Sequence, residues 1–198
     1  MTLRKLSILI LCLFAFQITS YSQIRGDIRA AAMSEVSFFN SGTLTSYGIS
    51  AEYFIHKNFS LNYQYSFGFN QNKNTYIHFP GALAGFIEMI RSDSYFLTSG
   101  ADDEGWTYLL LLTFVLPEGI SFHTYPRNWI ELAPFINPLS TDYNLLGNYR
   151  STITLSIGMK LHIKPVETFS ISPHAGLKYI YGNGKTGNYF GISMGWLF

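Results

Sequence analysis

The chain has 198 residues, of which 13% are charged and 17% are aromatic, and its formal net charge is +1. This length favours a single domain. Soluble domains usually carry about 25% charged residues, so the low charged fraction favours an outer surface that faces lipid. The near-neutral charge excludes the strongly basic surface that nucleic-acid binding requires, and no nucleic-acid partner is expected.

The first residues predict an export signal. Basic residues precede an apolar run from Leu6 to Phe16, and small polar residues lead on to Ser22. The run is too short to cross the roughly 30 Å hydrocarbon core as a helix, and this order of segments is typical of a secretory signal peptide. We expect residues 1–22 to be removed and residues 23–198 to form one barrel domain. The single cysteine lies within the signal, so no disulfide is expected.

Two segments alternate strictly between apolar and polar residues. From Phe59 to Asn70 every odd position is apolar or aromatic and every even position is small or polar, and the same holds from Ile153 to Ile163. Alternation at period two is typical of a strand with lipid on one face and a polar lumen on the other. The second of these strands is expected to begin at about Arg150. Weaker versions of the pattern predict six more strands, at residues 25–39, 44–56, 105–116, 119–131, 168–181 and 187–198.

The connections between these strands predict the topology. Short turns are expected at residues 56–58, 117–119 and 164–167, and they alternate with longer loops at residues 40–43, 71–104, 126–148 and 182–186. Short turns on one side and longer loops on the other are typical of an outer-membrane barrel. The expected fold is therefore all-β, an eight-stranded antiparallel transmembrane up-and-down β-barrel with both termini on the periplasmic side.

The longest loop, residues 71–104, contains a short stretch with helical periodicity. Leu83, Phe86, Ile87 and Ile90 share one face of a helix expected from Ala82 to Arg91. That apolar face could pack over the barrel mouth as a lid, or it could bind a surface protein, a glycan or lipopolysaccharide. Trp129 lies in the loop at residues 126–148, where three prolines prevent regular strand pairing. We expect this loop to form an ordered aromatic cap beside the long loop.

With these strands in place, the chain resembles the small eight-stranded outer-membrane β-barrel proteins of Gram-negative bacteria. The resemblance is carried by the signal segment, the hairpin from Tyr47 to Phe69 and the final strand from Tyr189 to Phe198. It implies a location in the bacterial outer membrane. It also implies that the closing aromatic residues Trp196 and Phe198 serve as the signal read by the barrel-insertion machinery. Members of this family differ in function, so the fold does not decide the activity.

The inward positions of the expected strands carry charges of both signs. Eight strands leave an interior just wide enough for side chains to fill, and buried charges are costly unless they are paired. We therefore expect a charge network that plugs the lumen. Its expected members are Arg29, Glu35, Glu52, Lys160, His174 and Lys178, and Gln64, His123 and His162 also face inward.

Enzyme and metal motifs are weak in this sequence. The outer-membrane lipid A deacylases place a histidine two residues before a serine, and no histidine here has that spacing. His123 and Glu131 are the pair most worth testing, but in an extended strand they would lie roughly 26 Å apart and meet only if the chain folded back. The five histidines are scattered, so no metal or other cofactor is expected.

The sequence therefore predicts a plugged barrel with a structural or surface-interaction role through its extracellular loops, and not an enzyme. Two alternatives remain open. A serine and a histidine converging at the outer rim would favour a lipid-A-modifying acyl hydrolase or transferase. An open file of inward charges past Lys160 and Lys178 would favour a small passive pore.

Overall fold

The computed structural model describes residues 26–40, 42–71, 75–81, 116–145, 151–181 and 184–198. The expected signal peptide at residues 1–22 and the expected helix from Ala82 to Arg91 lie outside these residues. Within them, all regular structure is strand. No helix in the described part of the chain is long and apolar enough to cross a membrane.

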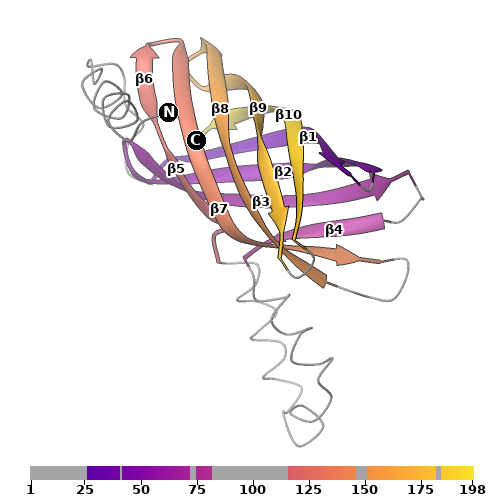
Figure 1. The fold of residues 1–198 in the computed structure, drawn as a ribbon. Helices are drawn as coiled ribbons and strands as arrows, with labels where there is room; N and C mark the ends of the chain where they lie inside the picture. Colours follow the sequence, from indigo (N-terminus) through magenta and orange to yellow (C-terminus); the bar gives the residue numbers. More distant parts are fainter. Residues whose placement is uncertain (1–25, 41, 72–74, 82–115, 146–150, 182–183) are drawn as a thin grey trace, which may run out of the picture.

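Ten strands form one antiparallel sheet (Figure 1). Their bounds are β1 Ile28–Phe39, β2 Gly42–His56, β3 Phe59–Asn70, β4 Thr75–Pro80, β5 Gly119–Phe122, β6 Thr124–Arg127, β7 Ile130–Asn144, β8 Ser151–Val166, β9 Phe169–Ile180 and β10 Lys185–Leu197. The all-β antiparallel prediction is confirmed. The six predicted strands that correspond to β1, β2, β3, β8, β9 and β10 agree with the structure to within a few residues.

The sheet closes on itself. β1 pairs with both β2 and β10, and the pairing continues from β10 through β9 and β8 to β7. Between β3 and β7, the short strands β4 and β5 follow each other along a single strand position, and β6 extends that position beside β7. The described strands therefore fill eight positions of a ring, which leaves no open sheet edge facing lipid.

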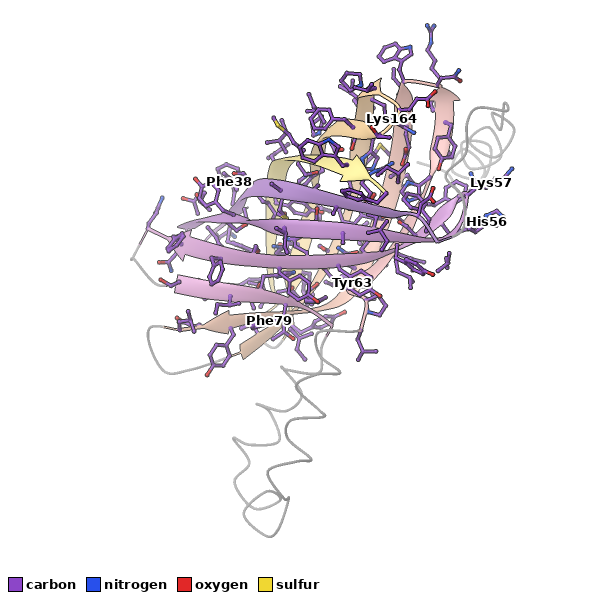
Figure 2. All side chains as sticks on the ribbon, turned by 180° about the vertical axis from the view of Figure 1, so that it is seen from behind. Phe38, His56, Lys57, Tyr63, Phe79 and Lys164 are labelled. Atoms are coloured by element: carbon purple, nitrogen blue, oxygen red, sulfur yellow. The ribbon has the colours of Figure 1, made fainter. Side chains whose placement is uncertain are left out.

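The two ends of the barrel differ. Tight turns join β2 to β3, β6 to β7 and β8 to β9 at the end where β1 begins and β10 finishes, and we call this the termini end. The opposite end, where β1 turns into β2, is called the mouth. Figure 2 shows Phe38 near the mouth and His56, Lys57 and Lys164 near the termini end. The predicted turns at residues 56–58 and 164–167 lie at the termini end, and the predicted connections from β1 to β2 and from β9 to β10 lie at the mouth.

The barrel is apolar outside and polar inside. Large apolar side chains such as Ile49 (61% exposed), Phe190 and Leu177 face outward, whereas Arg29, Glu52 and many serines are buried in the lumen. A water-soluble protein shows the reverse distribution, because its apolar groups leave water. The exposed apolar surface is therefore explained by contact with lipid.

The predicted fourth and fifth strands are corrected by the structure. The predicted fourth strand at residues 105–116 lies almost wholly outside the described residues, and its place in the wall is taken by β4, β5 and β6. The predicted fifth strand at residues 119–131 covers β5 and β6. It was expected to fill a strand position of its own, but β5 and β6 continue the position of β4 in the same direction. Residues 117–119 are consequently not a turn at the end of the barrel but part of the wall. Glu118 N donates to Asn62 O there (2.7 Å).

The loop predicted at residues 126–148 is also wrong, because most of it is strand β7. Prolines suggested irregular structure, but Pro134 lies in a gap of the neighbouring ladder, between the pairs Ser121–Phe135 and Thr124–Leu132. Pro138 lies in the bulge where the pairing of β7 with β8 shifts. Pro138 therefore lies where a missing N–H breaks no regular hydrogen bond, and Pro134 borders a gap on the side of β5 and β6 while it pairs with Met159 on β8.

The expected loop at residues 71–104 starts differently from its prediction. Thr75–Pro80 forms β4 and re-enters the wall beside β3. The chain leaves the wall at Gly81 and returns at Leu116, and these residues are neighbours: a Cβ built on Gly81 would lie 3.4 Å from the Leu116 Cβ. Residues 82–115 are thus inserted into one strand position partway along the barrel wall.

Candidate functional site

The lumen is the candidate site, because strand alternation turns the charged residues of six strands toward one another. Two groups of ion pairs lie one above the other along it. The group nearer the tight turns, here called the termini-end cluster, contains Arg29, Glu52, Glu131, Lys160, His162 and Lys164. The group nearer the mouth, called the mouth-end cluster, contains Glu35, His78, Glu118, Asp142, His174 and Lys178.

Arg29 is the centre of the termini-end cluster. Its guanidinium donates to Glu52 Oε2 (2.8 Å) on the neighbouring strand β2 and to both carboxylate oxygens of Glu131 (3.0 and 2.8 Å) on β7. All three side chains are buried. The planar guanidinium suits this position, since its several N–H donors can satisfy two carboxylates at once. β1 and β7 lie on opposite sides of the ring, so these bonds cross the lumen.

Two lysines also pair with these carboxylates. Lys160 Nζ lies 2.7 Å from Glu52 Oε1, and Lys164 Nζ lies 2.8 Å from Glu131 Oε2. Arg29 also donates to His162 Nε2 (3.0 Å), which fixes that nitrogen as an acceptor and leaves Nδ1–H to bond Ser172 Oγ (2.6 Å). The buried carboxylates are thus paired, as burial of charge requires.

The mouth-end cluster begins with Glu35 on β1. Lys178 Nζ on β9 donates to Glu35 Oε1 (3.0 Å), Ser37 Oγ donates to the same oxygen (3.1 Å), and His174 Nε2 lies 3.7 Å from Glu35 Oε2. The structure therefore places all six residues of the expected charge network in ion-paired groups. It divides them, however, between two groups instead of one.

Sequence reasoning missed the other half of the mouth-end cluster. His78 Nδ1 lies 2.6 Å from Asp142 Oδ1, and His78 Nε2 lies 3.5 Å from Glu118 Oε2. Asn137 and Ser140 both donate to Glu118 Oε1 (2.8 and 2.9 Å). All three ionisable residues fell in segments assigned to loops or a turn. His78 lies two residues after Tyr76 and two before Pro80. This spacing could have indicated a strand on which all three side chains share one face.

A buried serine, histidine and glutamate form a chain of hydrogen bonds. Ser60 Oγ lies 2.7 Å from His123 Nε2, and His123 Nδ1 lies 2.6 Å from Glu131 Oε1. The hairpin of β6 and β7 supplies the fold-back that brings His123 to Glu131. This order of groups is that of a nucleophile, a base and an orienting carboxylate.

The surroundings of this triad do not suit catalysis. Ser60, His123 and Glu131 are all 0% exposed, so an acyl substrate cannot reach Ser60 Oγ without opening the barrel. Glu131 is shared with Arg29 and Lys164, whereas an orienting carboxylate serves its histidine. The bonds also satisfy every group of the triad, which is what burial of polar side chains demands.

One set of side chains has the spacing of metal ligands. Glu52, His123 and His162 each offer a ligand atom within 4.8 Å of the others. The Arg29 guanidinium already lies among them, 2.8 Å from Glu52 and 3.0 Å from His162. A metal ion would have to displace this cation, so the residues do not fit a resident metal.

The remaining candidate residues are spread over the molecule. Leu83, Phe86, Ile87 and Ile90 lie outside the described residues. Trp129 lies in the tight turn between β6 and β7, at the termini end rather than in a cap over the mouth. Trp196 and Phe198 lie at the seam with β1: Trp196 pairs with Ala30, and Phe198 N donates to Ile28 O (2.8 Å).

Comparison with known proteins agrees with this architecture. No family model and no curated protein sequence matches the chain. The N-terminal β-barrel domain of OprF from Pseudomonas aeruginosa has a TM-score of 0.53 at 12% identity, covering 89% of this chain and 100% of that one. Neisserial surface protein A gives 0.48 at 12% identity, covering 86% and 94%. The attachment invasion locus protein Ail of Yersinia pestis gives 0.42 at 9% identity, covering 88% and 100%.

At such low identity, the likeness to the OprF domain establishes a fold and no activity. It agrees with the apolar outer surface, the polar lumen and the closed ring of strands. The fold that the predicted resemblance implies is confirmed: the chain forms a small closed antiparallel β-barrel, similar to the OprF domain.

Proposed function

We propose that the chain is a plugged, non-conducting barrel with a structural or surface-interaction role in the outer membrane. The observation that carries this proposal is the Arg29 guanidinium, which reaches Glu52 beside it and Glu131 across the lumen at 2.8 Å each. A salt bridge across the diameter of an eight-position ring leaves no continuous path for water or solutes along the lumen.

The rest of the lumen supports the same proposal over the passive pore. The Glu35–Lys178 and His78–Asp142 pairs form a second layer toward the mouth. Between the two layers lies a chamber of about 20 Å³, and a cavity needs about 10–15 Å³ to hold one water molecule. Breaking either layer would leave buried charges without partners, so transient opening is energetically costly.

The surface role is proposed for the segments outside the wall. The lumen residues bond one another, so contacts with other molecules fall to the barrel mouth and to the inserted segment with Leu83, Phe86, Ile87 and Ile90. The proposed partners remain lipopolysaccharide, a surface protein or a glycan. Trp196 and Phe198, at the seam where the ring closes, are proposed as the contact for the barrel-insertion machinery.

The Ser60–His123–Glu131 geometry is the observation that favours the second candidate, a lipid-A-modifying acyl hydrolase or transferase. Ser60 is fully buried near the tight turns. The acyl chains of a membrane lipid lie on the other side of the wall, along the apolar outer surface. We therefore propose that the triad is a structural hydrogen-bond chain of the plug.

Two measurements on purified, folded protein test these proposals. In planar bilayers, the barrel is expected to give no steady conductance, and stable ohmic channels absent from a heat-unfolded control would overturn the plug. A fluorophosphonate probe, which reacts with activated serines, is expected to leave Ser60 unlabelled. Labelling that disappears in Ser60→Ala would instead establish a reactive serine and favour the hydrolase.

A further inference from the structure

The barrel mouth holds a pocket that the ion-pair layers do not fill. Its volume is about 210 Å³. Each of the eight strand positions contributes a side chain to its wall, and together they form the last inward layer before the mouth. A site carried on strand ends of a closed ring is held more rigidly than one on loops, so little ordering is needed when a ligand binds.

The wall of this mouth pocket has an apolar side. Phe39 on β1 and Leu44 on β2 are neighbours. Ile180 on β9 follows beyond β10, whose Lys185 lines the pocket between Phe39 and Ile180. The first two provide an aromatic ring and an aliphatic side chain facing inward. Such a surface suits the C–H face of a small ring-shaped ligand, since apolar surfaces in a pocket gain by excluding water.

The opposite side of the pocket is polar. Asn70 on β3, Tyr76 on β4, Asp142 on β7 and Thr152 on β8 follow one another around the ring. An amide and a hydroxyl both donate and accept hydrogen bonds, whereas a carboxylate only accepts. A ligand that complements this mixed set needs several groups able to donate and accept, which is the property of hydroxyl groups.

The charges at the pocket argue for a neutral ligand. Asp142 and Lys185 line it and carry opposite charges, so their sum is zero. Asp142 is already held by His78 at 2.6 Å. An anionic or cationic ligand would meet one attractive and one repulsive group, whereas a neutral ligand meets no such conflict.

The pocket is closed toward the membrane interior. Lys178, the next inward residue below Ile180, donates to Glu35 (3.0 Å), and the His78–Asp142 pair occupies the other side of the same layer. Thr154 Oγ1, one inward position below Thr152, has no hydrogen-bond partner within the described residues. A ligand entering from outside would therefore be held at the mouth and not passed on.

We propose that the mouth pocket binds one neutral sugar ring, such as the terminal hexose of a glycan. A pyranose has an apolar face and a rim of hydroxyls, which matches the two sides of the pocket. The volume lies below the roughly 300–1,000 Å³ of sites for drug-sized ligands, so it admits a single ring. This inference rests on the proposed surface role and names its ligand class.

The test follows the methyl NMR signals of Leu44 and Ile180 in protein held in a detergent without a sugar headgroup. Neutral hexoses are titrated in turn, with glucuronic acid as the charged comparison. Saturable shifts of both methyl signals are expected, with half-saturation in the millimolar range typical of a small ligand. No saturable shift with any hexose, or tighter binding of the charged sugar, would overturn the proposal.

Two variants locate the binding. Leu44→Trp fills the pocket and is expected to abolish the Ile180 shifts, whereas Leu177→Trp makes the same change on the lipid-facing surface, where Leu177 is 61% exposed, and should leave binding intact. Shifts that survive Leu44→Trp would contradict the site. If Leu44→Trp fails to fold, Thr152→Val replaces it, with the outward-facing Thr45→Val as control, and binding at least severalfold weaker is expected for Thr152→Val alone.

The outcome is separable from that of the proposed function. A barrel that conducts ions would end the plugged-barrel proposal whether or not a hexose binds. A non-conducting barrel that binds no hexose would leave the proposed function in place and remove only the sugar site.

Discussion

Arg29 shows how a single residue determines the chemistry of the lumen. Its alternation with outward neighbours predicted an inward side chain, and the need to pair buried charge predicted acidic partners. Glu52, which lies opposite Arg29 in the pairing of β1 with β2, followed from that reasoning. Glu131 did not, because the predicted strand ended at residue 131 and residues 126–148 were assigned to a loop, and because its contact with Arg29 spans 102 positions of sequence. Partners on adjacent strands can be inferred from register, whereas partners across the ring require the closed fold.

At the residue scale, Arg29→Met is expected to destabilise the barrel by about 1.5–3 kcal/mol, because it removes the charged hydrogen bonds to Glu52 and Glu131, while Lys160 and Lys164 still pair with these carboxylates. Arg127→Met, the same change at an exposed position of β6, is expected to have little effect. The measurement is urea-induced unfolding of each variant folded into lipid vesicles. Equal losses in the two variants would show that the cluster contributes no specific stability.

At the scale of strands, the sequence predicted the long regular strands correctly. The prediction failed where β4, β5 and β6 share one strand position of the ring. Strict alternation located β3 to the residue, because lipid on one face and polar groups on the other impose period two. β5 and β6, of four residues each, are too short to show that periodicity, and the six residues of β4 show it only weakly. The insertion between Gly81 and Leu116 separates β4 from β5 in the sequence while they remain neighbours in the wall. Local patterns do not reveal such a split, since it depends on which distant segments complete one ladder.

This split predicts that the inserted segment can be removed. Deleting residues 82–115 joins Gly81 to Leu116, which already lie side by side, so the ladders of β4 and β5 with β7 are retained. The shortened chain is expected to keep heat-modifiable gel migration and β-sheet circular dichroism in detergent. Deleting Thr75–Pro80 instead removes the pairing of β4 with β3 and β7 and should abolish both. A shortened chain that fails to fold would show that the wall depends on the insertion.

At the scale of the whole molecule, closure depends on the seam between the first and last strands. β1 and β10 pair along their whole length, and the last residue takes part: Phe198 N donates to Ile28 O (2.8 Å) and Ile28 N donates to Phe198 O (3.0 Å). These bonds use only the backbone of Phe198. Its ring is 77% exposed on the outer surface. The backbone of Phe198 therefore closes the ring, while its exposed side chain is accessible for the proposed contact with the insertion machinery.

Phe198→Ala tests that separation, since it removes the ring and keeps both backbone bonds. Full burial of a large apolar side chain is worth about 1.5–3 kcal/mol, and a mostly exposed ring contributes less, so refolding of purified protein in detergent should be nearly unchanged. If the ring is read during insertion, the fraction of protein inserted in outer-membrane preparations should fall severalfold. Phe190→Ala, which removes another lipid-facing ring from β10 (58% exposed), serves as the control and should insert normally. Normal insertion of Phe198→Ala would remove the targeting role of this residue, whereas an equal loss in both variants would assign the effect to the apolar surface as a whole.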